Sequence, residues 1–225
     1  MKERTMIFNG EMVRAILDGR KTQTRRIMKV QPENAELGLR RITDSSVAKE
    51  VGMYFWCLAD ACGVKHRSNL FSCPFGEVGD RIWVREAFQG PLIPEEALSE
   101  FLGENPDKFE SPAYCEYAAD GGPRPEYVDA DDNTRYGWRP SIHMPRWASR
   151  ITLEITGVRV ERFASISSDD ARAEGYPTFR AADGGNIDPW LWFRDLWDGI
   201  YPDQSFKAHP WVWVIEFSRI EGGAE

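Results

Sequence analysis

The sequence predicts an α+β fold in which a small mixed β-barrel is flanked by short helices. Two observations lead to this class. Strand-like apolar runs are interspersed with short capped helices, without the regular strand–helix alternation of parallel α/β folds. Hydrophobic residues make up 42% of the 225 residues, which is enough to bury a core at this length.

The first helix is predicted over about residues 10–18. Asn9 is a good N-cap, apolar residues follow at helical spacing, and Gly19 stands in the position that often ends a helix. The Thr-containing alternation over residues 19–26 predicts an extended segment. Residues 31–75 lack clear periodicity and are expected to be irregular or to hold short strands.

The middle of the chain gives weaker signals. Residues 81–88 (RIWVREAF) are expected to form a strand after a turn, and the acidic stretch 91–112 has room for one or two helical turns around Phe101. A further strand is expected over residues 113–118. The Asp-, Gly- and Pro-rich residues that follow, up to Asn133, are typical of a loop.

The last third gives the clearest pattern. A strand is predicted over residues 151–160, with a β-bulge at Gly157, where the apolar alternation changes phase. Ser167 and Asp170 resemble a capping box for a helix that Gly175 ends. A second helix opens at residues 188–189, with Trp190, Phe193 and Trp197 as its buried stripe, and residues 211–217 form a closing strand.

Composition excludes several classes of protein. No run approaches the ~18 apolar residues of a membrane span, and the N-terminus lacks the apolar stretch of a signal peptide. Four cysteines in 225 residues do not make a disulfide framework. We therefore expect a soluble cytoplasmic protein without a membrane partner.

Charge is unevenly distributed along the chain. The net charge is −8, but residues 91–132 alone hold twelve acidic residues and two basic ones, so the rest of the chain carries +2. Basic side chains concentrate in residues 14–29 and 133–153. These two neighbourhoods are either solvated surfaces or a site for a phosphate-bearing or nucleotide-like ligand.

The common catalytic motifs are absent, including the phosphate-binding glycine loop, the nucleophile elbow and the HExxH zinc motif. One set of zinc-type ligands remains an open alternative, at Cys57, Cys62, His66 and Cys73. Its spacing lacks the tight CxxC knuckle of structural zinc sites. We therefore assign no metal and no cofactor.

The segment GRKTQTRR over residues 19–26 carries the strongest chemical signal. A lysine, a hydroxyl and an arginine within six residues can provide a base, a nucleophile and an anion contact. Threonine needs such a base, and a desolvated lysine can act as one. In a straight strand, however, Lys21 and Thr24 would point to opposite faces, so their convergence requires a bend. A solvated basic turn is the alternative.

This segment resembles the GxKxxTxR signature of the ASCH domain, a β-barrel family similar to the PUA domain. Four further stretches follow in the order of the family: residues 74–86, 141–150, 171–175 and 210–217. The chain is most similar to the larger members found in phages and prophages. The resemblance implies a single ASCH/PUA-like domain over residues 1–225, with insertions at about residues 31–75 and 91–140.

The resemblance also implies an activity. Small bacterial ASCH proteins include amidohydrolases that deacylate N4-acetylcytidine with a lysine, a threonine and a glutamate, and the matching positions here are Lys21, Thr24 and Glu174. Thr24 would attack the acyl carbonyl, Lys21 would act as base, and Glu174 would hold Lys21 or relay a proton to the leaving nitrogen.

We expect a nucleoside or modified-base substrate, contacted by five further side chains that lie in basic or aromatic surroundings: Arg26, Arg85, Glu86, His143 and Trp147. An Arg85–Glu86 pair has a structural role as its alternative. Two other functions remain open. PUA-like barrels also bind RNA or modified bases without catalysis, and some ASCH proteins are reported to cut RNA.

Overall fold

The computed structural model describes residues 1–61, 63–103, 106–128, 133–181, 183–204 and 206–220. It has the α+β composition that the sequence predicts. Its α-helices are α1 (Gly10–Leu17), α2 (Leu98–Leu102), α3 (Ser168–Ala173), α4 (Thr178–Ala181) and α5 (Asp188–Ile200).

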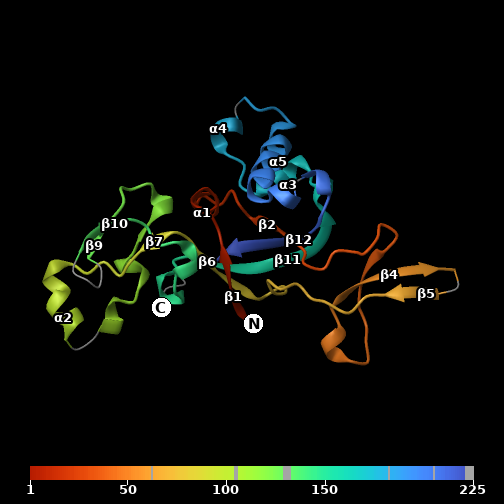
Figure 1. Cartoon of the computed structure of the whole chain (residues 1–225), viewed down its shortest axis with the longest axis horizontal. Helices are drawn as coiled ribbons and strands as arrows, with labels where there is room; N and C mark the ends of the chain where they lie inside the picture. The colour runs from red at the N-terminus through yellow and green to blue at the C-terminus, as the bar shows by residue number, and fades with distance from the viewer. Residues whose placement is uncertain (62, 104–105, 129–132, 182, 205, 221–225) are drawn as a thin grey trace.

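The centre of the molecule is a five-stranded sheet with the order β1-β6-β11-β12-β2 (Figure 1). Only β1 and β6 are parallel. The strands are β1 (Glu3–Ile7), β6 (Arg81–Arg85), β11 (Thr152–Arg162), β12 (Trp211–Arg219) and β2 (Gln23–Ile27).

The sheet is open, and the expected barrel is therefore confirmed only as far as the α+β class. Within the described residues no strand ladder joins the edge strands β1 and β2. A side chain spans the gap instead: Arg26 donates from its guanidinium to the carbonyl oxygen of Ile7 at 2.8 Å.

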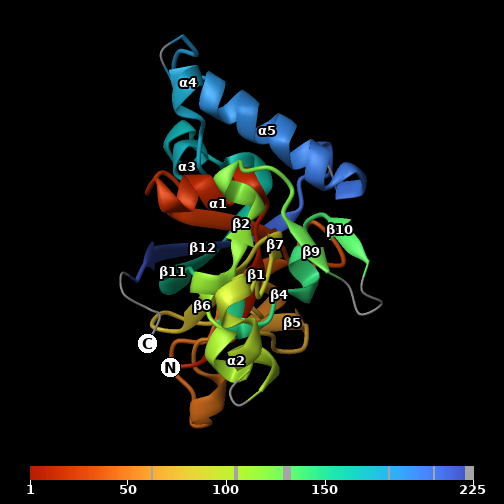
Figure 2. The same ribbon diagram turned by 90° about the vertical axis from the view of Figure 1, so that its left-hand side faces the viewer.

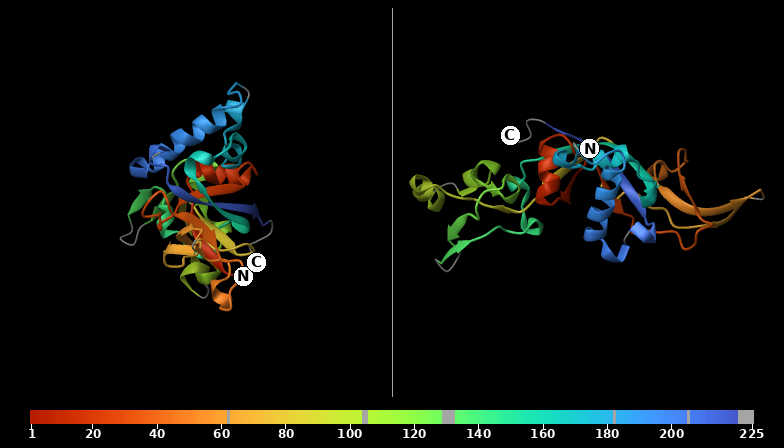
Figure 3. Two further views of the ribbon diagram at one scale, coloured as in Figure 1. Left: turned by 90° about the vertical axis from the view of Figure 1, so that its right-hand side faces the viewer. Right: turned by 90° about the horizontal axis from the view of Figure 1, so that it is seen from above.

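Two outer lobes extend from opposite ends of this sheet, as the views in Figures 1 and 3 show. One is a three-stranded antiparallel sheet within residues 31–75, the arm sheet, formed by β3 (Gly38–Arg41), β4 (Tyr54–Asp60) and β5 (Gly63–Arg67). The other holds α2 and the strand pairs β7 (Phe88–Gln89) with β8 (Glu116–Tyr117) and β9 (Glu126–Val128) with β10 (Thr134–Tyr136).

The prediction over residues 113–118 is mostly wrong. Only Glu116–Tyr117 is a strand. Ser111 caps a 3-10 turn, η4 (Pro112–Tyr114), with its hydroxyl accepting from the Ala113 amide, and a second 3-10 turn follows β8. A proline at the start of a turn and this local side-chain bond favour a turn over a strand. The predicted loop before Asn133 also contains β9.

The predicted helix caps are confirmed. The Asn9 side chain accepts from the Met12 amide at 2.8 Å, and Gly19 after α1 has φ +73°. Ser167 and Asp170 form the capping box of α3. The expected bulge in β11 is confirmed as well, because the register with β12 shifts between Ile155 and Gly157.

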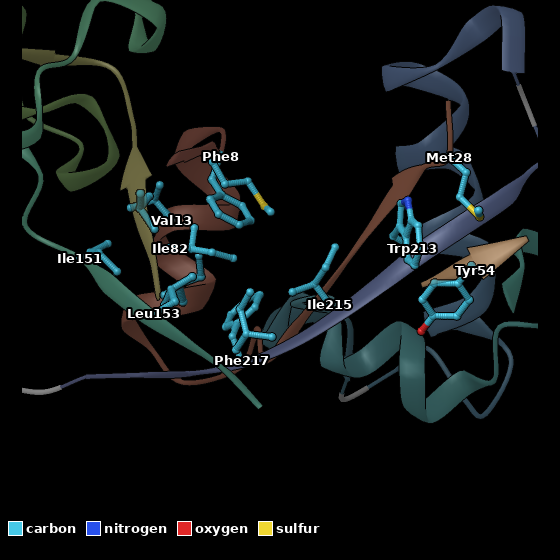
Figure 4. Close-up of a cluster of buried hydrophobic side chains, with 14 of the residues drawn as sticks. Phe8, Val13, Met28, Tyr54, Ile82, Ile151, Leu153, Trp213, Ile215 and Phe217 are labelled. Carbon is cyan, nitrogen blue, oxygen red and sulfur yellow. The ribbon is translucent and has the colours of Figure 1, made fainter. Parts of the chain in front are cut away.

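The sheet buries a core on each face. On one face the larger cluster gathers side chains of β1, β6, β11, β12 and α1, with Leu153, Ile215 and Phe217 among them and Phe8 beside them (Figure 4). On the other face α3 and α5 cover β2 and β12, with α5 crossing above the sheet (Figure 2). The predicted stripe of α5 lies in this second core, with Phe193 and Trp197 buried.

Candidate active site

Lys21 and Glu174 meet in the structure although 153 positions separate them. The turn after α1 holds Lys21 in place, because its amide and that of Arg20 both donate to the Ala15 carbonyl. The Lys21 ammonium nitrogen then donates to the Glu174 carboxylate at 2.7 Å and to the Glu174 carbonyl oxygen at 2.8 Å. The two side chains are 0% and 2% exposed, so water is excluded from the pair.

Glu174 is positioned by the end of α3. It is the C-cap of that helix, and Gly175 follows with φ +104°. A Cβ atom at Gly175 would lie 2.8 Å from the Cβ of Ala15 and 3.3 Å from the Cβ of Lys21. Both the backbone angle and the close approach therefore require glycine at this point. This packing brings α3 against the turn that carries Lys21.

Arg25 makes the site a network. One guanidinium nitrogen donates to the other carboxylate oxygen of Glu174 at 3.1 Å, and a second donates to Glu161 at 3.1 Å. Arg159 in turn contacts Glu161 and Asp170. No sequence motif selects these partners, since they come from β2, β11 and α3. The one available signal was alternation, which places residues 23 and 25 on one face of β2.

Burial changes the acidity of Lys21. Desolvation lowers the pKa of Lys21 below its ordinary value of 10.5, and this effect outweighs the opposing attraction of the Glu174 carboxylate. The nearby guanidinium groups of Arg25 and Arg26 lower the pKa further. Lys21 can therefore give up its proton more readily than an exposed lysine, as a general base must.

Thr24 lies on the other face of β2 from this network. Lys21 and Arg25 both reach Glu174. Arg26 instead stacks over Phe8, on the face of the sheet that carries the larger core cluster, with its guanidinium carbon 5.3 Å from the ring centre. By alternation, Thr24 shares the face of Arg26. Its side chain is buried, and within the described residues no hydrogen bond involves its hydroxyl. The structure thus joins Lys21 to Glu174 but does not bring Thr24 to them.

The remaining candidate residues lie elsewhere. Arg85 donates to the Ile142 carbonyl oxygen and stacks on Trp83. Trp147 packs against a small core that includes Phe88, Tyr117 and Met144, in the lobe that holds α2. His143 is exposed. None of their described hydrogen bonds or ring contacts involves Lys21, Thr24 or Glu174.

The expected Arg85–Glu86 pair does not form. Strand β6 ends at Arg85, and Glu86 after it is buried and bound instead by Arg150, at 3.0 and 3.1 Å. Burial raises the pKa of Glu86 despite that contact. The arginine partner matches the structural alternative that the sequence left open for Glu86.

The zinc alternative gains no geometric support from the described residues. Cys62 lies outside them. Leu58 pairs with His66 across the β4–β5 ladder, so His66 points to the opposite face from Cys57. In the described part of the chain no group of three or more His, Cys, Asp or Glu side chains is arranged to hold a metal ion.

A cavity of about 520 Å³ opens beside Glu174. The guanidinium of Arg20 borders it and donates to the carbonyl oxygens of Gly175 and Tyr176. The wall of the cavity combines apolar, aromatic and basic side chains from α1, α4 and α5, among them Met12, Arg14, Phe179, Arg180, Trp192 and Leu196. Neither Lys21 nor Thr24 lines it, so Glu174 is the member of the predicted triad that this cavity reaches.

No family model, curated protein or solved structure matches the chain. In the described residues no helix has the length and apolar content needed to cross a membrane.

Proposed function

We propose that this protein is an amidohydrolase of the ASCH, PUA-like type, which removes an acyl group from the exocyclic N4 of cytidine-type nucleosides. The observation that carries the proposal is the buried contact between Lys21 and Glu174. Only the resemblance of the sequence connected these two positions in advance. A lysine with a lowered pKa, held against a carboxylate in a dry site, is suited to proton transfer.

The chemistry requires a nucleophile, a base and a proton for the leaving nitrogen. The base removes a proton from the attacking oxygen, the oxygen bonds to the acyl carbon, the carbon–nitrogen bond breaks, and N4 takes up the proton. Lys21 acts as base, and Glu174 orients it and passes the proton to N4. The products are cytidine and the free carboxylic acid.

Two attacking groups fit this scheme. If Thr24 attacks, an ester forms on its hydroxyl and water then hydrolyses this ester. On this route the acyl group lies on the face of β2 that carries the larger core cluster. If water attacks, the acyl group lies in the cavity that Glu174 lines, where Phe179 and Trp192 can stack on the cytosine ring. Lys21 does not line this cavity, so on this route the proton of the water reaches Lys21 through the Glu174 carboxylate. The position of Thr24 on the face opposite Glu174 favours the water route.

The second candidate function is binding of RNA or a modified base without catalysis. One observation favours it: the Lys21 side chain has no exposed surface and is already hydrogen-bonded twice to Glu174. Such a pair can serve simply to hold α3 against the sheet. RNA cleavage has no comparable observation in its favour.

The test is incubation with N4-acetylcytidine, with release of cytidine followed by ultraviolet absorbance. Lys21→Met should abolish release, while the matched control Lys29→Met should retain it, because Lys29 is exposed. Thr24→Val separates the routes, with Thr22→Val as its control. Loss of activity in Thr24→Val alone indicates the threonine route, and retained activity indicates the water route.

Two outcomes contradict the proposal. Full activity in a folded Lys21→Met variant excludes Lys21 as the base. No release by the folded wild-type protein, together with saturable binding of the same nucleoside, favours the binding function.

A further inference from the structure

A second cavity, of about 450 Å³, lies between the central sheet and the arm sheet and is strongly basic. Four cationic side chains line it from three separate segments: Lys2 and Arg4 at the start of the chain, Arg41 at the end of β3, and Lys49 in the 3-10 turn η1 (Ala48–Glu50). None of these residues belongs to the Lys21–Glu174 network. Long-range folding therefore gathers four positive charges around one hollow.

In the described part of the chain these four cations form no close ion pair, although Arg4 and Asp80 attract each other at longer range. Within the described residues, none of the four side chains makes an ion pair or a hydrogen bond, and the Nε of Arg4 is buried without a partner. Arg41 stacks over the Tyr54 ring, with its guanidinium carbon 5.7 Å from the ring centre. A guanidinium N–H that is buried without a partner is costly, and an anion bound among the four cations would give the Arg4 N–H an acceptor.

The acidic residues of the cavity do not neutralise it. Asp80 is already engaged, since its carboxylate accepts from the backbone amides of Lys2 at 2.6 Å and Glu77 at 3.3 Å. Glu77 is exposed. Counting both carboxylates, the lining still carries a formal charge of +2.

Tyr54 adds a neutral hydrogen-bond donor. Its ring packs edge-on against Trp213, with its hydroxyl directed away from that residue (Figure 4). In the described part of the chain no hydrogen bond involves this hydroxyl. Burial raises the pKa of Tyr54, so the phenol stays protonated and can donate to an oxyanion.

From this geometry we propose that the cavity binds the phosphate monoester of a small molecule such as a nucleoside 5′-monophosphate. Arginine suits this ligand because its planar fork matches phosphate oxygens. A compact dianion neutralises the net charge of the lining. A long polyanion fits less well, since its affinity depends on many phosphate contacts along an extended basic surface, and the chain as a whole carries −8.

The site is independent of the proposed hydrolysis. Its readout is binding without turnover, so either proposal can fail while the other stands. The probes are inorganic phosphate, cytidine 5′-monophosphate, cytidine, and a short RNA without terminal phosphates, each titrated calorimetrically in constant chloride. Phosphate and the monophosphate should bind, and cytidine should not bind at this site.

The variants are Arg4→Gln and Arg41→Gln, with Arg40→Gln as the matched control. Arg40 and Arg41 are neighbours on β3 and point to opposite faces, and only Arg41 lines the cavity. Arg41 is exposed, so its variant remains a test even if Arg4→Gln does not fold.

Each folded cavity variant should weaken binding of the monophosphate by about tenfold or more, and Arg40→Gln should leave it unchanged. Equal losses in Arg40→Gln and Arg41→Gln would show non-specific attraction and overturn the proposal. So would a failure of the wild-type protein to bind phosphate at millimolar concentration. Binding of the RNA in preference to the monophosphate would assign the site to a polymer instead.

Discussion

Two buried glutamates in this molecule show how the choice of cation decides what an ion pair can do. Glu174 is held by Lys21 and Arg25, and Glu86 is held by Arg150. Both carboxylates are 2% exposed. Their surroundings nevertheless differ in chemistry.

The cluster around Glu86 holds its side chains in fixed positions. Arg150 binds Glu86 with two hydrogen bonds and Asp120 with two more, and its guanidinium lies 3.9 Å from the centre of the Tyr117 ring. Arginine keeps its charge at every physiological pH, so this cluster fixes geometry and transfers no proton. At Glu174 the partner is a lysine whose pKa burial has lowered, and that cation can become a base.

The largest expected effect comes from removing each glutamate. Glu174→Leu leaves Lys21 and Arg25 buried without a shared counter-charge, and we expect a loss of about 3–5 kcal/mol in the free energy of unfolding. Glu86→Leu should cost less, about 1–3 kcal/mol, because Arg150 keeps Asp120 and is partly exposed. Urea unfolding followed by circular dichroism measures both. Equal losses would contradict the distinction between the two clusters.

A second comparison uses the glycines that follow an acidic residue of each cluster. Gly175→Ala combines a strained φ with a clash against Ala15, and should destabilise the fold by about 2–4 kcal/mol. Gly121→Ala, after Asp120, has φ +80° but open space around it, so only the backbone cost of about 1 kcal/mol applies. Thermal unfolding of the two variants provides the test. If Gly175→Ala destabilised the fold no more than Gly121→Ala, α3 would be able to move away from Ala15 at little cost.

The pH dependence of stability should have opposite signs at the two clusters. The fold disfavours charged Lys21, so between its lowered pKa and 10.5 the unfolded chain binds the extra proton. Stability therefore rises with pH there, by at most about 1.4 kcal/mol per unit, and this rise should be missing in Lys21→Met.

Glu86 should make stability fall as the pH rises. Its pKa is raised above 4.5, so the folded state binds the extra proton, and its contribution declines as pH rises through the raised value. Urea unfolding across both ranges, with Glu86→Gln as reference in the acidic one, measures the two slopes. Matching curves for wild type and Lys21→Met would exclude the lowered lysine pKa.

The smallest effect is expected on the same helix as Glu174. Asp169 pairs with Arg172 one turn away, but its side chain is 94% exposed. Exposed pairs contribute little because water screens them. Asp169→Asn should leave the unfolding midpoint within experimental error, and a large shift would mean that α3 is held mainly by its surface charges.

Local signals in the sequence were sufficient for the short helices and the bulge. Caps, glycine stops and apolar spacing act within a few residues, which is why α1, α3, α5 and the irregularity at Gly157 are confirmed. Strand β1 was not predicted. Its pairing with β6 joins segments nearly 80 residues apart, and nothing local announces such a contact.

The candidate site also has residues that were predicted from the sequence and residues that were not. The pairing of Lys21 with Glu174 followed from resemblance alone, and the structure brings the two residues together. Arg25, Glu161 and Arg159 were missed as site residues, because each looks like an ordinary surface charge until the sheet and α3 bring them together, with Arg25 buried and the other two partly exposed. Thr24 was grouped with Lys21 because both lie in the segment that resembles the ASCH signature, and the separation of their side chains is the one expected for residues three apart in an extended segment without a bend.

The distance between Lys21 and Glu174 along the chain also sets a timing. A ribosome that adds about 5–20 residues per second completes Glu174 roughly 8 to 30 seconds after Lys21. The strand next to β2, β12, is made later still. Until then Lys21 is a hydrated ammonium group of ordinary basicity. Whatever this lysine does, it begins only when the last strand of the sheet is in place.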